Sequence, residues 1–108
     1  MGDVFHTDCP ARRLLGHLTG RWSLLVLAAL DDGPLRYHEI RRTVEGISDK
    51  MLAATLRTLV DHHLLSREVG DGNPPRVDYA LTDLGRGAST ALQPLLTWIR
   101  ENADEITR

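Results

Sequence analysis

Arginine is the residue type in this chain best suited to specific recognition chemistry. All but one of its 13 basic residues are arginines, and the exception is Lys50. A guanidinium group presents a planar fork of donors that matches phosphate oxygens and the edge of guanine. The formal net charge of the 108 residues is only -2, so bulk charge does not indicate a nucleic-acid partner. The placement of the arginines therefore matters more than their number.

The thiol of Cys9, the only cysteine, is a second reactive group. Pro10 suits the start of a helix there, and Arg12 and Arg13 follow in its next turn. A helix N-terminus and nearby cations both favour a thiolate, which is the reactive form of cysteine. A sensing thiol and an inert structural thiol are both compatible with this pattern. A single cysteine cannot form a disulfide within the chain.

Other kinds of site lack the residues they need. Two pairs could begin a metal site: His6 with Cys9, and His62 with His63. No further ligands follow at zinc-like spacing. The sequence shows no nucleophile with base and orienter and no paired carboxylates, and the loop at residues 70–73 is too short to cradle a phosphate. We therefore predict no enzyme activity, no metal and no cofactor.

Composition predicts one small globular domain. Hydrophobic residues make up 42% of the chain and charged residues 26%. No apolar run approaches the roughly 18–20 residues that cross a bilayer, and the N-terminus lacks the basic start and apolar stretch of a secretory signal. We expect no membrane contact and a reducing, cytoplasmic location.

Hydrophobic periodicity predicts a mainly α-helical fold with a small β-hairpin. Helical spacing recurs over residues 10–18, 22–30, 37–44 and 48–62. In the second segment leucine and alanine outnumber β-branched residues, which favours a buried helix over a buried strand. Strands are predicted at residues 65–69 and 76–81, with a very short one at 35–36. A last helix, capped by Thr82, should cover residues 83–102, where Pro94 should kink or divide it.

Helices followed by a hairpin and a further helix, in that order, form the plan of a winged helix-turn-helix domain. Segments 37–44 and 48–62 would be the helix pair, and the second would enter a major groove, with Ser48 as its N-cap. The preceding helix and the hairpin would contact phosphates. Trp22, Tyr37 and Tyr79 are expected in the core.

Motifs along the chain resemble those of HxlR-type transcriptional regulators. The matching segments occur in order: Cys9-Pro10, Gly20-Arg21-Trp22, Gly33-Pro34-Leu35-Arg36-Tyr37, Gly46-Ile47-Ser48-Asp49-Lys50-Met51-Leu52 and Pro74-Pro75-Arg76-Val77-Asp78-Tyr79-Ala80-Leu81-Thr82. The resemblance covers about residues 9–100. It implies a small bacterial winged-helix repressor or activator, similar in layout to the MarR group, that binds DNA as a homodimer. Several such proteins sense electrophiles or oxidants through an intersubunit disulfide at the place of Cys9.

The resemblance implies DNA contacts from the recognition helix, its flanks and the hairpin. The expected contact residues are Arg36, Arg41, Arg42, Ser48, Lys50, Ala53, Ala54, Arg57 and Arg76. Arg57 is a better base reader than Lys50 because its fork can be bidentate. Ala53 and Ala54, where relatives often carry amides, can only touch a thymine methyl group. For Arg36, Arg41 and Arg42, around helix 37–44, the alternative is a surface ion pair with Glu39 or Glu45. For Arg76 the alternative is a charge at the edge of a strand.

The sequence also departs from the family just before the first hairpin strand. His63 stands where relatives usually have glycine. Either this histidine adopts the left-handed conformation, at a cost of about 1 kcal/mol, or the helix ends in another way.

The last helix offers more apolar surface than so small a domain can cover. Together with Leu14 of the first helix, its residues form the predicted homodimer interface: Leu14, Leu92, Leu95, Leu96, Trp98 and Ile99. The predicted organisation is a flexible arm at residues 1–8, the winged-helix domain with its dimerisation helix at 9–102, and a loose end at 103–108.

The predicted function is sequence-specific binding of double-stranded DNA by a homodimer at a pseudo-palindromic operator. A repressor associated with the nucleoid, responsive to an oxidant or a small ligand, fits this expectation. The alternative is a winged helix that binds a protein or ligand and has no sequence-specific DNA binding. A strong dependence of duplex binding on salt would separate the two.

Overall fold

The computed structural model describes residues 4–107, and it is mainly helical. The elements in chain order are α1 (Pro10–Leu18), α2 (Arg21–Ala29), β1 (Leu35–Arg36), α3 (Tyr37–Thr43), α4 (Asp49–Asp61), β2 (Leu65–Val69), β3 (Val77–Leu81) and α5 (Asp83–Ile106). These confirm the predicted order of helices and strands, including a helix at α2. Within the described range, no helix is both long and apolar enough to cross a membrane.

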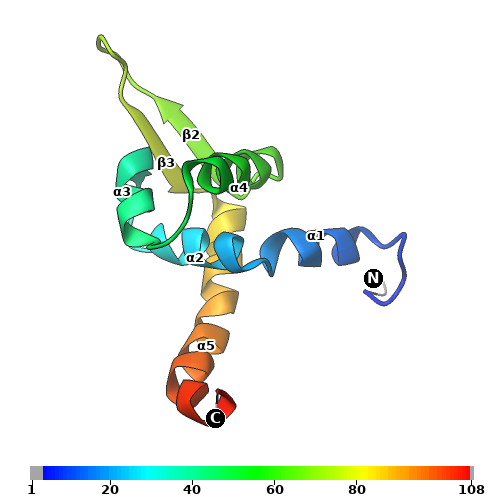
Figure 1. Cartoon of the computed structure of the whole chain (residues 1–108). Helices are drawn as coiled ribbons and strands as arrows, with labels where there is room; N and C mark the ends of the chain where they lie inside the picture. Colours follow the sequence, from blue (N-terminus) through cyan, green and yellow to red (C-terminus); the bar gives the residue numbers. More distant parts are fainter. Residues whose placement is uncertain (1–3, 108) are drawn as a thin grey trace.

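The strands form one small antiparallel sheet in the order β1-β3-β2. The predicted hairpin of β2 and β3 is confirmed, with Arg67 opposite Tyr79. The very short strand β1 adds to the other edge of β3, where Leu35 pairs with the same Tyr79. Figure 1 shows the hairpin projecting from one end of the molecule and α5 extending from the other. We call the β2–β3 hairpin the wing.

The core lies where α2, α3, α4 and the base of the wing meet. Its buried members are Val26, Leu27, Leu30, Ile40, Val44, Ile47, Leu52, Leu56, Leu59, Leu64 and Leu65. Trp22, Tyr37 and Tyr79 are partly buried and pack against this cluster, as predicted. The core thus holds the helix pair α3–α4 against the wing.

The C-terminal end of α4 is closed by a left-handed residue. His63 has φ 62°, which confirms the first of the two alternatives for this position. Its N–H donates to the carbonyl of Val60 at 3.0 Å, and the N–H of Leu64 donates to that of Leu59 at 2.9 Å. These two bonds form a Schellman motif, which turns the chain directly into β2.

The start of α5 is fastened to the same turn. Thr82 caps the helix by accepting a bond from the N–H of Gly85 at 3.0 Å, and its hydroxyl donates to the carbonyl of His63 at 2.6 Å. Its own N–H donates to the carbonyl of Leu64 at 3.2 Å. A β-carbon placed on Gly85 would lie 1.9 Å from that same Leu64 oxygen. Only glycine therefore allows this close approach. We call the contact the α5 joint.

Two expectations about α5 need correction. The helix continues to Ile106, so its predicted end at residue 102 is wrong. Of the two outcomes predicted for Pro94, division is wrong because the helix continues through this residue, whereas a kink there stays a prediction. The last turn is supported by the Thr107 N–H, which donates to the carbonyl of Ala103 at 3.0 Å. Of the two ends predicted to be loose, residues 1–3 and 108 lie outside the described part.

Candidate nucleic-acid interface

Helix α4 is oriented with one face in the core and one in solvent. Leu52, Leu56 and Leu59 are buried on the inner face. The outer face exposes Lys50, Ala54 and Arg57, while Ala53 is half-buried at its edge. Ser48 begins the helix as predicted, because its hydroxyl accepts a bond from the N–H of Met51 at 3.1 Å. The exposed face therefore carries the side chains predicted for the recognition helix.

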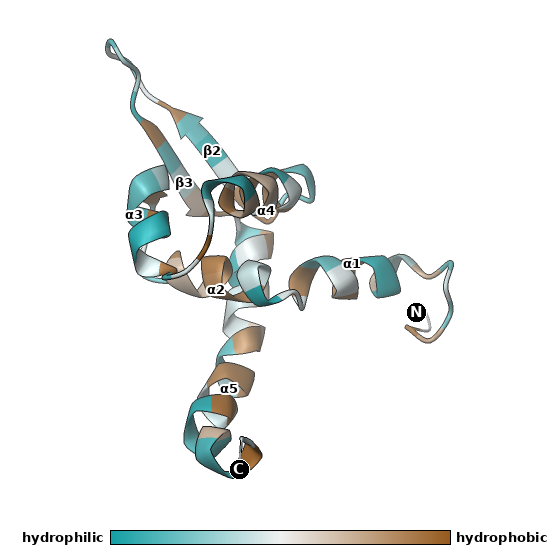
Figure 2. Ribbon diagram, in the orientation of Figure 1, coloured by the Kyte–Doolittle hydropathy of each residue, from teal (hydrophilic) through white to brown (hydrophobic). Residues whose placement is uncertain are grey.

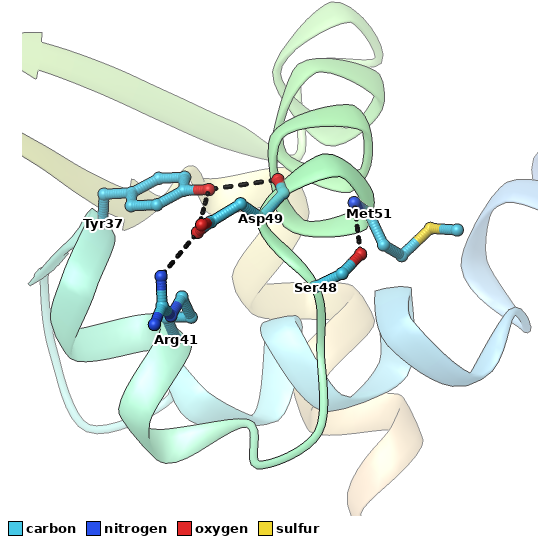
Figure 3. Close-up of polar contacts among 5 residues, drawn as sticks. All are labelled: Tyr37, Arg41, Ser48, Asp49 and Met51. Carbon is cyan, nitrogen blue, oxygen red and sulfur yellow. Dashed lines mark hydrogen bonds and ion pairs between the residues drawn. The ribbon is translucent and has the colours of Figure 1, made fainter.

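A polar network joins α3 to the first turn of α4 (Figure 3). The Tyr37 hydroxyl donates to the carbonyl and to the carboxylate of Asp49, at 3.1 and 3.2 Å. Arg41 donates to the same carboxylate at 2.8 Å. The hydrogen bond from Arg41 lowers the pKa of Asp49 below its usual 3.8. Partial burial, followed by the bond to Asp49, raises the pKa of Tyr37 above 10.0, so Tyr37 remains a donor at neutral pH. This network fixes α3 to the start of α4.

The network changes the interpretation of Arg41. The sequence predicted either a phosphate contact or an ion pair with Glu39 or Glu45. The ion-pair partner of Arg41 is instead Asp49, which lies eight residues later in the next helix. Glu39 accepts a bond from the N–H of Arg36 at 2.8 Å and so caps α3. Both members of the Arg41–Asp49 pair are exposed, so Arg41 can exchange this partner for a phosphate.

The wing contributes two arginines with different surroundings. Arg76, selected from the sequence, pairs through Nε with the carboxylate of Asp78 at 3.1 Å. Arg67 of β2 was not predicted as a contact residue, and its side chain has no hydrogen-bond or ion-pair partner among the residues described. It lies directly opposite Tyr79 across the strand pair. The alternation of side chains along the wing strands was the signal that would have placed Arg67 beside α4.

Several free basic groups lie on α3, α4 and the wing. Four exposed cations there have no side-chain partner within the described part of the chain: Arg42, Lys50, Arg57 and Arg67. Arg36 is half-buried at the start of α3. This arrangement places unpaired donors on the recognition helix and on both of its flanks, which suits a phosphate-lined groove.

Cys9 lies at the N-cap of α1, as the sequence predicted, but it is buried, with 7% of its surface exposed. The segment before it folds back: the N–H of Cys9 donates to the carbonyl of His6 at 3.2 Å. Arg12 donates to the carbonyl of Phe5 at 2.8 Å. The residue is therefore poorly exposed to solvent in this structure. Among residues 4–107, no three His, Cys, Asp or Glu side chains lie together as metal ligands.

Apolar side chains remain uncovered on α1 and α5. Leu14, Leu95, Trp98 and Ile99 are between 39% and 54% exposed, and Leu96 is half-buried. Leu92, also predicted for the interface, packs in part against the chain's own core. Leu84 and Ile106 are more exposed still, at 59% and 57%, and the sequence analysis did not predict them for the interface. In Figure 2 hydrophobic segments continue along the part of α5 that projects from the molecule.

Comparison with known proteins agrees with this geometry. The profile of the HxlR-like helix-turn-helix family matches residues 17–107. An uncharacterized HTH-type transcriptional regulator of Escherichia coli, YtfH, is 40% identical over 105 residues, which are 97% of this chain and 83% of YtfH.

Two solved structures extend the comparison. YtfH from Salmonella typhimurium superposes with a TM-score of 0.90 at 39% identity, over 99% of this chain and 96% of that one. The redox regulator HypR in its reduced form superposes with a TM-score of 0.82 at 31% identity, over 91% and 97%. The chain therefore belongs to the HxlR-like helix-turn-helix family and has its winged helix-turn-helix fold.

Proposed function

We propose that this chain is a homodimeric transcriptional repressor that binds a specific pseudo-palindromic site in double-stranded DNA. The observation that carries the proposal is the outer face of α4, where Lys50 and Arg57 stand unpaired beside Ala54. Two such helices would enter successive major grooves about 34 Å apart. Bound across a promoter in the cytoplasm, at the nucleoid, the dimer would obstruct RNA polymerase.

The contacts divide into base readers and phosphate ligands. Arg57 would read guanine through its two-pronged guanidinium group, and Ala53 and Ala54 would pack on thymine methyl groups. Ser48 and Lys50 would contact the backbone where the helix enters the groove. Phosphate contacts on the flanks would come from the arginines of α3 and the wing: Arg36, Arg41, Arg42, Arg67 and Arg76. Because the chain's net charge is -2, binding would depend on where these cations stand, and a second copy would double the number of them that face the DNA.

DNA binding can be tested with an operator selected from random duplexes and measured by fluorescence anisotropy at several salt concentrations. We expect Arg57→Ala to cost about 1–3 kcal/mol and to relax specificity at one position, whereas Arg76→Ala should weaken all sequences alike. Arg86→Ala, on the exposed surface of α5, is the control and should change neither. Binding that is absent or independent of salt would contradict the proposal and would favour a protein-binding or ligand-binding module.

The dimer would be held by α5 and α1, within a unit of residues 9–102 extended to Ile106. Its support is the uncovered apolar surface of Leu14, Leu95, Leu96, Trp98 and Ile99, with a smaller share from Leu92. Sedimentation should show a dimer at micromolar concentration for the wild type and a monomer for Trp98→Glu. Val69→Glu, which changes an exposed apolar residue on the wing, should remain dimeric. A monomeric wild type would refute this arrangement.

Regulation through Cys9 is part of the proposal. It is supported by the position of the thiol at the N-cap of α1 and by the likeness to the redox regulator HypR. The likeness to diamide-treated YodB from Bacillus subtilis, at 36% identity, supports it further. Opening of the segment before α1 would expose the thiol, and a disulfide to the second subunit would change the spacing of the two recognition helices. Diamide should then alter operator affinity for the wild type and not for Cys9→Ser. Identical responses would remove the switch from the proposal.

A further inference from the structure

A cavity of about 280 Å³ lies between the outer part of α4 and the wing. It is separate from the apolar face of α5 and from Cys9, because its lining comes from α3, α4, β2 and β3. Its volume is close to the lower end of the range for small-molecule sites, about 300–1,000 Å³. The space therefore suits one small, compact ligand.

The walls of the cavity are apolar and aromatic. Leu56, a member of the core, and the partly buried Val60 supply an aliphatic surface. Tyr37 and Tyr79 contribute their rings, and both are partly buried against the core. Rings of this kind prefer to contact another flat ring in a stacked or edge-to-face arrangement. The walls favour a planar apolar body.

The charged residues that line the cavity are two cations and one anion. Arg57 comes from α4, Arg67 from β2, and Asp61 from the last turn of α4. None of the three side chains has a hydrogen-bond or ion-pair partner in the described structure, so both guanidinium groups are free to bind a ligand. Their sum of one positive charge matches a monoanion. A carboxylate is the group that a guanidinium fork holds with two parallel bonds.

We propose that this cavity binds a small aromatic monocarboxylate and that the bound ligand competes with DNA. The ring would lie against Tyr37 and Tyr79, and the carboxylate would be held by Arg57 and Arg67. Competition follows because Arg57 is also exposed on the recognition helix, where it cannot serve a ligand and a base at once. The binding step stands on the cavity alone, whereas the competition rests on the proposed function.

The binding step is tested by calorimetric titration of the protein, without DNA, with four probes. Benzoate should bind with a dissociation constant below about 1 mM. Benzamide has the same shape without the charge, acetate has the charge without the ring, and inorganic phosphate is an anion without a ring. Each of these three should bind at least about tenfold more weakly, because each lacks one half of the proposed recognition.

Variants locate the bound ligand. Arg67→Gln should weaken benzoate about tenfold, which is the usual loss for one charge-assisted contact. Arg86→Gln removes an equal charge from α5, outside the cavity, and should leave benzoate binding unchanged. Equal losses in both variants would show a general charge effect and would overturn the site. Phosphate or acetate binding as tightly as benzoate would overturn the aromatic class of the ligand.

Competition is read separately, from operator affinity at saturating benzoate and at the same concentration of benzamide. We expect benzoate to weaken the operator complex at least tenfold and benzamide to have no effect. Unchanged operator affinity with benzoate bound would overturn the competition and leave DNA binding intact. If the protein bound no operator under any condition, the proposed function would fail. The titration without DNA would still decide whether the cavity binds benzoate.

Discussion

The α5 joint makes a sharp prediction about a single methyl group. Real β-carbons stay at least 3.0 Å from other heavy atoms, so the Gly85→Ala side chain would have to retreat by at least about 1.1 Å from the Leu64 oxygen. That displacement would stretch the two hydrogen bonds of Thr82 to His63 and Leu64, each worth about 0.5–1.5 kcal/mol. Overpacking adds about 1–3 kcal/mol. The better helix propensity of alanine returns at most about 1 kcal/mol. A net loss of about 2–4 kcal/mol follows.

Gly87 provides the matched control in the same helix. A β-carbon there would meet nothing within 4 Å, so Gly87→Ala should stabilise the protein by up to about 1 kcal/mol. Both variants can be compared by urea denaturation at one protein concentration, which keeps any contribution from association constant. If Gly85→Ala were as stable as Gly87→Ala, the close contact at the joint would not exist as described.

Three further changes test other parts of the structure. The pKa of Asp49 is lowered in the folded state, so the stability that its carboxylate adds should be fully present above pH 3.8 and be lost as the pH falls further. Denaturation across the acid range should therefore show the difference in free energy of unfolding between the wild type and Asp49→Asn disappearing below pH 3.8. His63→Gly should raise the free energy of unfolding by about 0.5–1 kcal/mol because glycine accepts a positive φ, whereas His63→Ala should bring no such gain. Ser89 is fully buried and its hydroxyl donates to the Asp31 carboxylate at 3.0 Å, so Ser89→Ala should cost about 1 kcal/mol in the same assay, and no loss would show that this bond between α5 and the turn after α2 adds nothing.

Local signals predicted most of the fold. The caps at Ser48 and Thr82 and the apolar spacing along α4 act over a few residues, and the structure confirms each of them. The end of α5 was missed because no glycine or proline marks it after Pro94. The sequence left two alternatives for the backbone conformation of His63, because this conformation depends on how the chain must turn into β2.

The site was harder to predict where it depends on tertiary contacts. The bond of Arg41 to Asp49 requires the angle between α3 and α4, which no local pattern provides. Arg67 joins Arg57 at the same cavity only because the wing folds beside α4. The sequence indicated which side chains could bind DNA, whereas their partners and free neighbours follow from the packing.

The length of α5 also converts small rotations into large movements. Its 24 residues span about 36 Å at 1.5 Å per residue, and its contacts with the rest of the domain, at the α5 joint, Ser89 and Leu92, lie in its first half. A bend of about 5° just after Leu92 would carry the far end, about 21 Å away, through about 2 Å. In a dimer held by this helix, the far end is the pivot and the recognition helix is what moves. A bend of a few degrees would therefore change the spacing of the two recognition helices, so in the proposed dimer the helix would act as a lever as well as an interface.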